Sequence, residues 1–302
     1  MNRELLAHLP VAVAVARDGG FAAAASRLNM SPSAVSHAVR AVEEALGAPL
    51  FARTTRSVAL TEAGERFLAA VTPALATISD ASERVAADNG RVTGVLRLNT
   101  PRVALGIAIT AVVTAMAWRH PDLTIEITQD DALVDIVAGG FDAGVRLGEM
   151  IAEDMVAVRL TPPFKSIMVA SPSYLDAKGE PRTLADLRHH NCIGYRLVST
   201  GATYRWELSD NGRDVSVQVG GTVRVTDSAL ARDLALAGVG IAYLFEPLVR
   251  ADIRERRLKW LLPKASVEEP GLFLYYPPTV GEMPKLRAFI EVAREVLRAR
   301  GR

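Results

Sequence analysis

The sequence contains few of the features that mark several common protein classes. Its 302 residues include a single cysteine, Cys192, so no disulfide can form within the chain. That usage fits a reducing compartment, and we expect the protein in the cytoplasm. Basic residues (35) and acidic residues (34) almost balance. This balance excludes a generally polybasic protein and restricts any contact with nucleic acid to a local patch. The chain also has no low-complexity tract and no obvious internal repeat.

The chain has no apolar run of membrane-spanning length. Residues 103–118 are 16 consecutive uncharged residues between two arginines, whereas a helix needs about 20 apolar residues to cross a bilayer. We predict a helix buried against a sheet instead. Residues 5–16 resemble the apolar core of a signal peptide, but Glu4 offsets the arginine before it, and His8 and Pro10 interrupt the run. We therefore expect neither export nor a membrane partner.

Catalytic signatures are missing as well. No Ser-His-Asp spacing, phosphate loop or dinucleotide fingerprint occurs, and the glycines before Phe21 lack the dinucleotide pattern. His189, His190 and Cys192 are too few for a typical metal site, which needs three or four ligands. Cys192 has no second cysteine with which to form a redox switch. We predict no enzyme activity, no cofactor and no metal.

What the chain does have, within residues 20–47, is a helix, a tight turn and a second helix. An alanine-rich stretch at residues 21–28 predicts the first helix, and the next two residues form the turn. Ser31 is the predicted N-cap of the second helix, with Pro32 at its first position. Gly47 is predicted to end that helix.

The second helix divides into an apolar face and a polar face. Apolar residues recur at i, i+4, i+7 and i+11 on the face predicted to be buried: Val35, Val39, Val42 and Leu46. The opposite face carries hydrogen-bonding side chains and no acid: Ser33, Ser36, His37 and Arg40. Base edges in the major groove offer donors and acceptors, so this face is typical of a helix that reads DNA. Taken alone, the stripe would also fit an ordinary amphipathic core helix.

A basic, hydroxyl-rich tip follows between two short apolar segments, residues 50–51 and 58–60. It consists of Arg53, Thr54, Thr55, Arg56 and Ser57. Residues 1–60 hold six arginines, no lysine and four acids, a positive bias that only a local patch could use. We predict a hairpin that touches the phosphate backbone.

The order AA..L..S.SAVS..V..VE..LG.PLF.RT.R...LTEAG resembles the N-terminal winged helix-turn-helix of LysR-type transcriptional regulators. The matching positions are Ala24, Ala25, Leu28, Ser31, Ser33 to Ser36, Val39, Val42, Glu43, Leu46, Gly47, Pro49 to Phe51, Arg53, Thr54, Arg56 and Leu60 to Gly64. We expect Ser33, Ser36, His37 and Arg40, with the capping Ser31, to face base edges, and Arg53, Thr55 and Arg56 to hold phosphates or the minor groove. Pro10 departs from the pattern, so the domain's first helix either begins near Pro10 or is kinked there.

A long helix follows the hairpin. Thr61 is its predicted cap, and it extends to about Ala87, with a bend expected at Pro73. Apolar residues repeat along it at the spacing of a coiled coil: Leu68, Val71, Leu75, Ile78 and Val85. We expect homodimerisation through this stripe, and packing onto its own domain is the alternative. Residues 89–94, with two glycines, are the predicted hinge.

From Val95 onward, short apolar strands alternate with helices, which predicts a mostly parallel α/β arrangement with a helix around residues 133–138. Two lobes of this kind, with the segments VASPSYL, TLADLRHHNCI and ALAGVGIAYL, resemble the periplasmic-binding-protein type of effector domain in the same regulators. The predicted fold is an all-α winged helix-turn-helix head (1–60), a linker and dimerisation helix (61–90) and a two-lobed α/β effector domain (93–302). Lobe 1 would comprise residues 93–161 and 266–302, and lobe 2 residues 162–265.

Ligands of open α/β sheets bind at the carboxyl ends of strands, between lobes. In the first lobe Thr100 ends a strand and Arg102 begins a helix, a combination that favours an anion, and Arg146 follows another strand. Candidate positions in the second lobe are Ser199, Thr200, Thr203, Thr226 and Asp227. The resemblance implies that Thr100, Thr203 and the turn at 226–228 line the effector pocket. Each could instead be a capping or turn residue, and Arg146 could pair with Glu149.

These features together predict a non-catalytic transcription regulator. It would bind double-stranded promoter DNA as a homo-oligomer, a dimer or a dimer of dimers, and respond to a small-molecule effector such as a carboxylate. The effector would change the angle between the lobes, and it can do so only through different affinities for two states. The alternative is a solute-binding protein with an N-terminal appendage. An enzyme built on the cleft is disfavoured by the absence of a convergent nucleophile and base.

Overall fold

The computed structural model describes residues 3–53, 58–132 and 134–300. The chain divides into two compact units, Met1–Gly90 and Arg91–Arg302. The division falls within the glycine-containing segment that the sequence marks as a hinge. Each unit has its own hydrophobic core.

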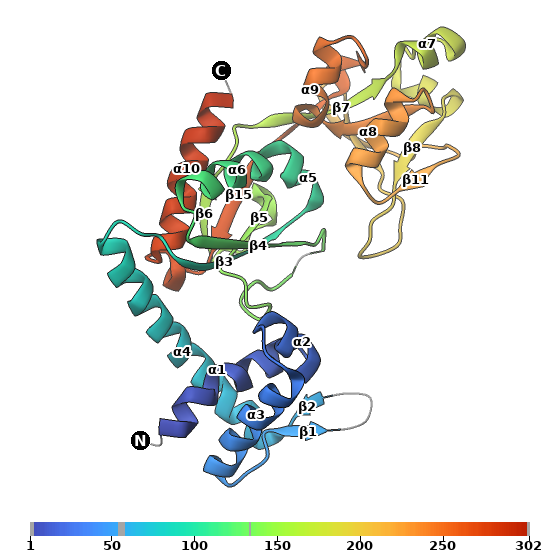
Figure 1. The fold of residues 1–302 in the computed structure, drawn as a ribbon. Helices are drawn as coiled ribbons and strands as arrows, with labels where there is room; N and C mark the ends of the chain where they lie inside the picture. Colours follow the sequence, from blue (N-terminus) through green and yellow to red (C-terminus); the bar gives the residue numbers. More distant parts are fainter. Residues whose placement is uncertain (1–2, 54–57, 133, 301–302) are drawn as a thin grey trace. The chain divides into compact units, whose positions relative to one another are not determined.

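The first unit is a small helical domain with a two-stranded hairpin (Figure 1). Its elements are α1 (Arg3–Arg17), α2 (Phe21–Arg27), α3 (Pro32–Leu46), β1 (Phe51–Arg53), β2 (Val58–Leu60) and α4 (Glu62–Asp88). The predicted caps of α3 are confirmed: the Ser31 hydroxyl accepts from the Ala34 amide at 3.2 Å, and Gly47 ends the helix with a φ of 65°. The positive φ explains the glycine, because other residues rarely adopt it.

Helix α1 resolves the question of Pro10. The helix begins at Arg3, well before the proline, and continues through it, so the expectation that it begins near Pro10 is wrong. An interior proline costs a helix about 3 kcal/mol. Burial of Leu9 and Val15 in the core of the unit offsets that cost, because a buried leucine or valine side chain contributes roughly 1.5–3 kcal/mol.

Two side chains anchor the base of the β1–β2 hairpin. The Glu43 carboxylate accepts hydrogen bonds from the Leu50 and Phe51 amides at 2.8 and 3.1 Å. Thr61 donates from its hydroxyl to the Pro49 carbonyl at 2.7 Å and accepts from the Gly64 amide at 2.9 Å, which caps α4 as predicted. The hairpin is thereby tied to α3 on one side and to α4 on the other.

The second unit contains two mixed sheets, each in a lobe of its own. The first sheet has the order β4 (Leu123–Gln129), β3 (Gly94–Thr100), β5 (Ala143–Leu147), β15 (Leu272–Tyr276) and β6 (Val156–Arg159). Helices α6 (Thr110–Arg119) and α10 (Pro284–Arg300) pack on it. The segment before α6 consists of α5 (Arg102–Ala104) and a π-helical turn, Leu105–Ile109.

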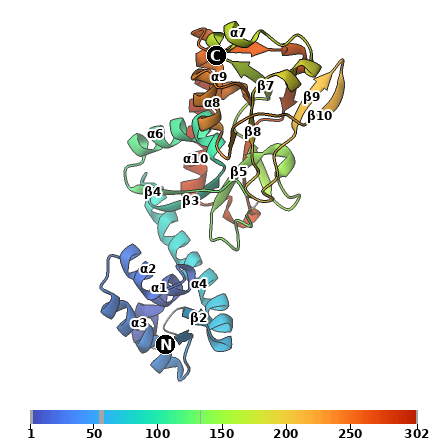
Figure 2. The same ribbon diagram turned by 90° about the vertical axis from the view of Figure 1, so that its right-hand side faces the viewer.

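The second sheet has the order β11 (Arg224–Val225), β8 (Cys192–Tyr195), β12 (Ile241–Phe245), β7 (Phe164–Ala170) and β13 (Lys259–Leu261), and β14 (Val267–Glu269) also pairs with β7. Alternate residues of β7 enter two separate cores. One core includes α8 (Ser228–Leu236) and α9 (Glu246–Arg254). The other includes α7 (Pro172–Lys178) and β9 (Trp206–Asp210), the partner of β10 (Arg213–Val217) (Figure 2). Short 3₁₀ turns occur at Gly148–Met150, Leu184–His189, Pro263–Ala265 and Pro278–Val280.

Three expectations for the second unit are corrected. The sheets are mixed rather than mostly parallel, because β15 runs antiparallel to β5 and β6, and β7 antiparallel to β12, β13 and β14. The region of 134–138 is a series of turns and not a helix; the Asp135 carboxylate caps it by accepting from the Val137 and Ala138 amides. Strand β14 belongs to the second sheet, so the chain returns to the first lobe at about Pro270 and not at residue 266.

Among the described residues, the segment Arg102–Arg119 has the length and apolar composition of a membrane span, and so do α1 and α2 if this bent pair is taken as one span. Both segments pack into the hydrophobic cores of their units. Ile109, Val112 and Met116 are buried in the core of the first lobe, while Trp118 on the opposite side is 86% exposed. The predicted packing of this segment against a sheet is confirmed for one face of the helix.

Candidate functional site

The outer face of α3 is the first candidate site. Ser33, His37 and Arg40 are exposed and Ser36 is half-buried, while Val35, Val39 and Val42 on the other face are buried in the core of the unit. The Ser31 and Ser33 hydroxyls lie 3.0 Å apart at the start of the helix. The division of α3 into a polar outer face and an apolar inner face is therefore confirmed. Three of the four side chains predicted to contact bases, those of Ser33, His37 and Arg40, are accessible to a large polar partner.

Part of the predicted hairpin surface falls outside the described residues. The strands β1 and β2 pair with Arg53 opposite Val58. Thr55 and Arg56 lie outside the described residues, and so does the side chain of Arg53. The contacts proposed for these residues rest on the sequence.

The apolar stripe of α4 divides into two parts. Leu68 is only 4% exposed and lies in the core of its own unit, and Val71 and Leu75 pack partly against that core. Leu68 is therefore not available to a partner, contrary to its assignment as a dimerisation residue. Ile78 and Val85 are 62% and 64% exposed and line a shallow groove with Ala81 and Ser82. These four residues have the i, i+3, i+4, i+7 spacing of one helix face.

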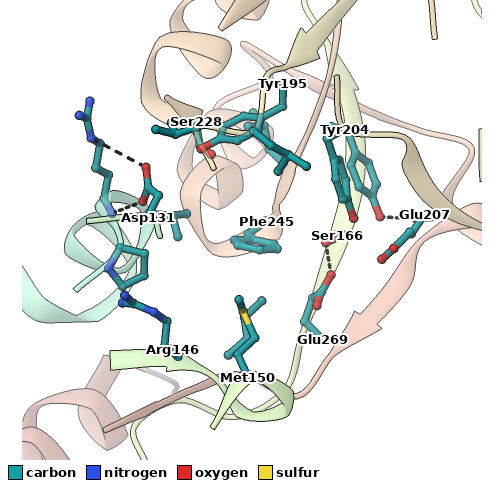
Figure 3. A pocket seen from close by; sticks show the side chains of 18 of the residues that line it. Asp131, Arg146, Met150, Ser166, Tyr195, Tyr204, Glu207, Ser228, Phe245 and Glu269 are labelled. Carbon is teal, nitrogen blue, oxygen red and sulfur yellow. Dashed lines mark hydrogen bonds and ion pairs between the residues drawn. The ribbon is translucent and has the colours of Figure 1, made fainter. Parts of the chain in front are cut away.

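The second candidate site is a cavity of about 480 Å³ between the two lobes of the second unit. The first lobe contributes Arg102, Asp131, Arg146 and Met150, and the second contributes side chains from β7, β8, β9, β12 and β14. Figure 3 shows Arg146 and Asp131 on one side, Glu207, Glu269 and Tyr204 on the other, and Phe245 between them. The volume is in the range of small-molecule sites.

Arg146 is the buried cation of this cavity. Its side chain is 2% exposed; it donates to the Val145 and Ala132 carbonyls and to the Asn99 side chain, each at 2.7 Å. Its Nε has no acceptor, and it forms no ion pair with a described side chain. Burial lowers the pKa of this guanidinium, although Tyr275, Asp130 and Asp131 act in the opposite direction. An arginine nevertheless stays protonated, so the first lobe holds a buried positive charge against the cavity.

Arg102 differs because it has acidic partners. Its amide donates to the Asp131 carboxylate at 2.9 Å, and its guanidinium lies 3.9 Å from the same carboxylate. The guanidinium also lies 3.7 Å from the carboxylate of Asp227 in the second lobe. Asp227 is the N-cap of α8 and accepts from the Ala229 and Leu230 amides. Arg102 and Asp227 thus form a direct ionic contact between the lobes.

The second lobe presents carboxylates and phenols. The Tyr204 hydroxyl bonds to the Glu207 side chain, and burial raises the pKa of that tyrosine. The Tyr243 hydroxyl donates to the Glu207 carbonyl, and Ser166 donates to the Glu269 carboxylate. Burial also raises the pKa of Tyr243, so both phenols are neutral near pH 7 and act as donors to these acceptors.

Of the predicted effector-binding residues, the structure brings Arg102, Arg146 and Ser199 to the cavity, together with Ser228 of the turn predicted at 226–228. The remaining predicted positions do not line it: Thr100, Thr200, Thr203, Thr226 and Asp227. Thr100 is fully buried at the end of β3, and its hydroxyl donates to the Pro101 carbonyl. The Thr200 hydroxyl accepts from the Ala202 amide within a turn, and the Thr226 carbonyl accepts from Tyr195. These residues shape loops and caps beside the cavity.

Several lining residues were not predicted. Five of them come from strands of the second lobe, namely Ser166, Tyr195, Glu207, Tyr243 and Glu269, and Tyr204 comes from the segment just before β9. Glu269 lies on β14, which the sequence had assigned to the other lobe. The alternation of polar and apolar residues in IAYLF and WELSD indicates that Tyr243 and Glu207 face away from the core. Only the pairing of the strands shows that both side chains face the same cavity.

Cys192 is shielded from chemical modification. Its side chain is 2% exposed, and burial raises the pKa of the thiol to about 12. At pH 7.5 the thiolate is therefore a minute fraction. We expect a thiol-reactive chromophore such as DTNB to label Cys192 at least about a hundredfold more slowly in the native protein than in urea. Equal rates in the two conditions would contradict the burial of this thiol.

His190 couples the stability of the second lobe to pH. Its Nδ1 lies 3.1 Å from the Tyr174 hydroxyl, which already accepts from the Asn191 amide at 2.9 Å. The phenol can therefore donate to Nδ1 when the ring is neutral. Burial lowers the pKa of His190, with His189 acting in the same direction and Asp186 against it.

This depressed pKa predicts a loss of stability in mild acid. The unfolded histidine has a pKa of about 6.5, so below that pH the unfolded chain binds more protons than the native state and the free energy of unfolding decreases. The contribution is fully present above about pH 6.5 and is lost as the pH falls towards the lower folded pKa. Urea unfolding of the parent and of His190→Gln between pH 7.5 and 5 should show a shallower decline for the variant; identical slopes would count against this account.

Comparison with known proteins identifies the families to which the two units are similar. Residues 6–65 match the family model of the bacterial regulatory helix-turn-helix protein, lysR family, and residues 89–298 match that of the LysR substrate binding domain. The chain is 38% identical over 277 residues to the HTH-type transcriptional regulator PgrR of Escherichia coli K12, covering 92% of this chain and 93% of PgrR. It is 36% identical over 281 residues to the uncharacterized HTH-type transcriptional regulator YcaN of the same organism, covering 93% and 92%.

A solved structure has the same order of domains along its chain. CrgA, a LysR-type transcriptional regulator from Neisseria meningitidis, aligns over 98% of this chain and 99% of its own, with 26% identity and a TM-score of 0.62. These matches to full-length regulators cover both units of the chain. The alternative, a solute-binding protein with an N-terminal appendage, would not explain a match over the first unit. The two family models cover the helix-turn-helix and the two-lobed unit almost completely. The chain therefore belongs to the LysR family, whose members are transcriptional regulators with a DNA-binding helix-turn-helix and an effector-binding domain, and are not enzymes.

Proposed function

We propose that this regulator binds promoter DNA with α3 in the major groove and the β1–β2 hairpin against the backbone. The observation that carries this proposal is the outer face of α3, where Ser33, His37 and Arg40 are exposed and no acid interrupts them. Positive and hydrogen-bonding side chains at the start of an exposed helix suit base edges surrounded by phosphates. Glu43, the first acid of the helix, is directed to the Leu50 and Phe51 amides instead.

The test is a titration of the full-length protein with the duplex upstream of its own gene and neighbouring gene. We expect protection of an inverted repeat in footprinting, and much weaker binding to a scrambled duplex of equal length. Specific and non-specific affinities of such proteins commonly differ by about 10³-fold or more. Equal affinity for the promoter and scrambled duplexes would exclude specific recognition.

The proposed regulator acts as a homo-oligomer in the cytoplasm, with dimers formed through the exposed part of α4. Ile78 and Val85 are large apolar side chains in water on a long helix, and a second α4 would bury them. Replacing Ile78 with glutamate should therefore lower the fraction of dimer, because a buried, unpaired carboxylate is costly. Sedimentation velocity at micromolar protein measures this, with Thr77→Glu on the same helix as the control. An unchanged sedimentation coefficient for Ile78→Glu would place the dimer contact elsewhere.

We further propose that the cavity between the lobes is the effector site and that it binds a carboxylate through Arg146. The guanidinium lines the cavity, is buried, and lacks a carboxylate partner among the described residues. A ligand anion would supply that partner. The Arg102–Asp227 contact links the lobes at the rim of the same cavity, so a ligand that rearranges Arg102 would favour one lobe angle over another.

A further inference from the structure

The cavity between the lobes is electrically polarised, and this polarity limits which molecules fit it. The first lobe contributes two arginines and one aspartate, Arg102, Arg146 and Asp131. The side chains that the second lobe contributes include two carboxylates, Glu207 and Glu269, and no lysine or arginine. Figure 3 shows Arg146 and Glu269 on opposite sides of the space. A ligand that spans the cavity therefore meets positive charge at one end and negative charge at the other.

The positive end is built to receive an anion. Arg146 is held by three hydrogen bonds to neutral acceptors, namely two carbonyls and the Asn99 amide oxygen. None of these neutralises the charge, and the Nε remains without an acceptor. A buried guanidinium in this condition is stabilised by a carboxylate, which the planar donor fork matches.

The opposite end is built to receive donors with positive charge. The hydroxyl groups of Tyr204 and Tyr243 are used to donate to the side chain and the backbone of Glu207. The oxygens that remain on this wall accept hydrogen bonds. Tyr243 also stacks on Trp206 with ring centroids 5.5 Å apart, so aromatic rings lie beside the carboxylates. Carboxylates combined with aromatic rings are the surroundings that bind ammonium groups.

We propose that the effector is a zwitterion of the amino-acid or short-peptide class. Its carboxylate would pair with Arg146, and its ammonium group would lie against Glu207, Glu269 and the ring of Tyr243. This inference rests on the proposed role of the cavity as the effector site and specifies the chemistry of its ligand. A dicarboxylate would bring a second negative charge to the wall that holds Glu207 and Glu269, where like charges repel. A monocarboxylate without an amine would make no charge-assisted contact with the wall that holds Glu207.

The test compares ligands that differ only in their charged ends. Free amino acids and unmodified dipeptides are screened by thermal shift with the full-length protein, and each compound that stabilises it is then compared by calorimetry with its N-acetyl and C-amide derivatives. We expect both derivatives to bind at least about tenfold more weakly, because each loses one charge-assisted contact. An N-acetyl derivative that binds as tightly as its parent would overturn the inference, and so would a screen in which no compound with both charges stabilises the protein.

Substitutions at the two ends of the cavity test which side chains bind the carboxylate and the ammonium group of the ligand. Glu207→Gln and Glu269→Gln should each weaken binding of the stabilising compound by about tenfold and remove its preference over the N-acetyl derivative. Arg146→Met should remove its preference over the C-amide. Glu268→Gln is the matched control, since Glu268 is the exposed neighbour of Glu269 on β14 and does not line the cavity; an equal loss in this control would overturn the assignment.

The promoter titration distinguishes this inference from the proposed function. A protein that binds its promoter specifically but prefers N-acetyl compounds retains its proposed role and loses only the zwitterion. If the protein binds zwitterions but does not recognise promoter DNA, the ligand assignment is supported and the proposed function is contradicted.

Discussion

Replacing Arg40 with alanine should weaken binding of promoter DNA by about ten- to a hundredfold. Arg40 is exposed on the outer face of α3, two turns from the N-terminal end at which such a helix enters the groove. A side chain that contacts a base edge contributes roughly 1–3 kcal/mol, and its loss relaxes specificity at one position of the site. The measurement is a gel-shift titration of parent and variant at one stated salt concentration, because phosphate contacts make affinity depend strongly on salt.

The matched control removes an arginine elsewhere. Arg298→Ala in α10 deletes the same charge from an exposed position in the second unit, and it should leave the affinity for promoter DNA within about twofold. If Arg40→Ala bound the promoter as tightly as the parent, α3 would not be the reading helix. An equal loss in both variants would instead indicate a general effect of net charge.

Replacing Gly64 with alanine should destabilise the first unit by about 2–4 kcal/mol. A Cβ at this position would lie 2.1 Å from the Leu50 carbonyl oxygen. That oxygen accepts the Thr61 amide at 2.9 Å, so it cannot move away without loosening the junction between the hairpin and α4. Affinity for promoter DNA should fall in parallel, because the same junction holds the hairpin in place.

Because of where the tryptophans lie, unfolding of the two units can be measured separately. All three tryptophans, Trp118, Trp206 and Trp260, belong to the second unit, so their fluorescence reports its unfolding alone. Gly64→Ala should shift the early loss of helical circular dichroism to lower urea and leave the fluorescence transition in place. The control is Gly20→Ala, where φ is 171° and no heavy atom lies within 4 Å of the added Cβ; it should cost less than about 1 kcal/mol. A Gly64→Ala protein as stable as this control would refute the steric argument.

Local sequence signals accounted for most of the first unit. Ser31, Pro32 and Gly47 act within one turn of their own positions, so the bounds of α3 followed from the chemistry of caps. Pro10 was misleading because its local penalty is opposed by burial of neighbouring residues in a core made by α2, α3 and α4. Leu68 was misleading for the same reason, since periodicity identifies an apolar face but not what covers it.

The cavity was less predictable than the DNA-binding face. Arg102 and Arg146 were found because strand ends and helix starts indicate where ligands lie in α/β proteins. Glu207, Tyr243 and Glu269 were missed because they belong to strands rather than to the loops that follow them. Their meeting depends on how β9, β12 and β14 are placed around one space, and β14 had been given to the wrong lobe.

By itself, the order of residues determined the helix-turn-helix, the caps of its helices, the long α4 and the two-lobed character of the remainder. These features depend on contacts between residues near each other in the chain, which spacing and residue type describe well. Only the tertiary structure decided which part of α4 stays exposed, how the mixed sheets are ordered, and that a buried arginine faces two carboxylates across one cavity. Those outcomes depend on contacts between residues far apart in the chain, where many pairings fit the same local pattern and packing selects one.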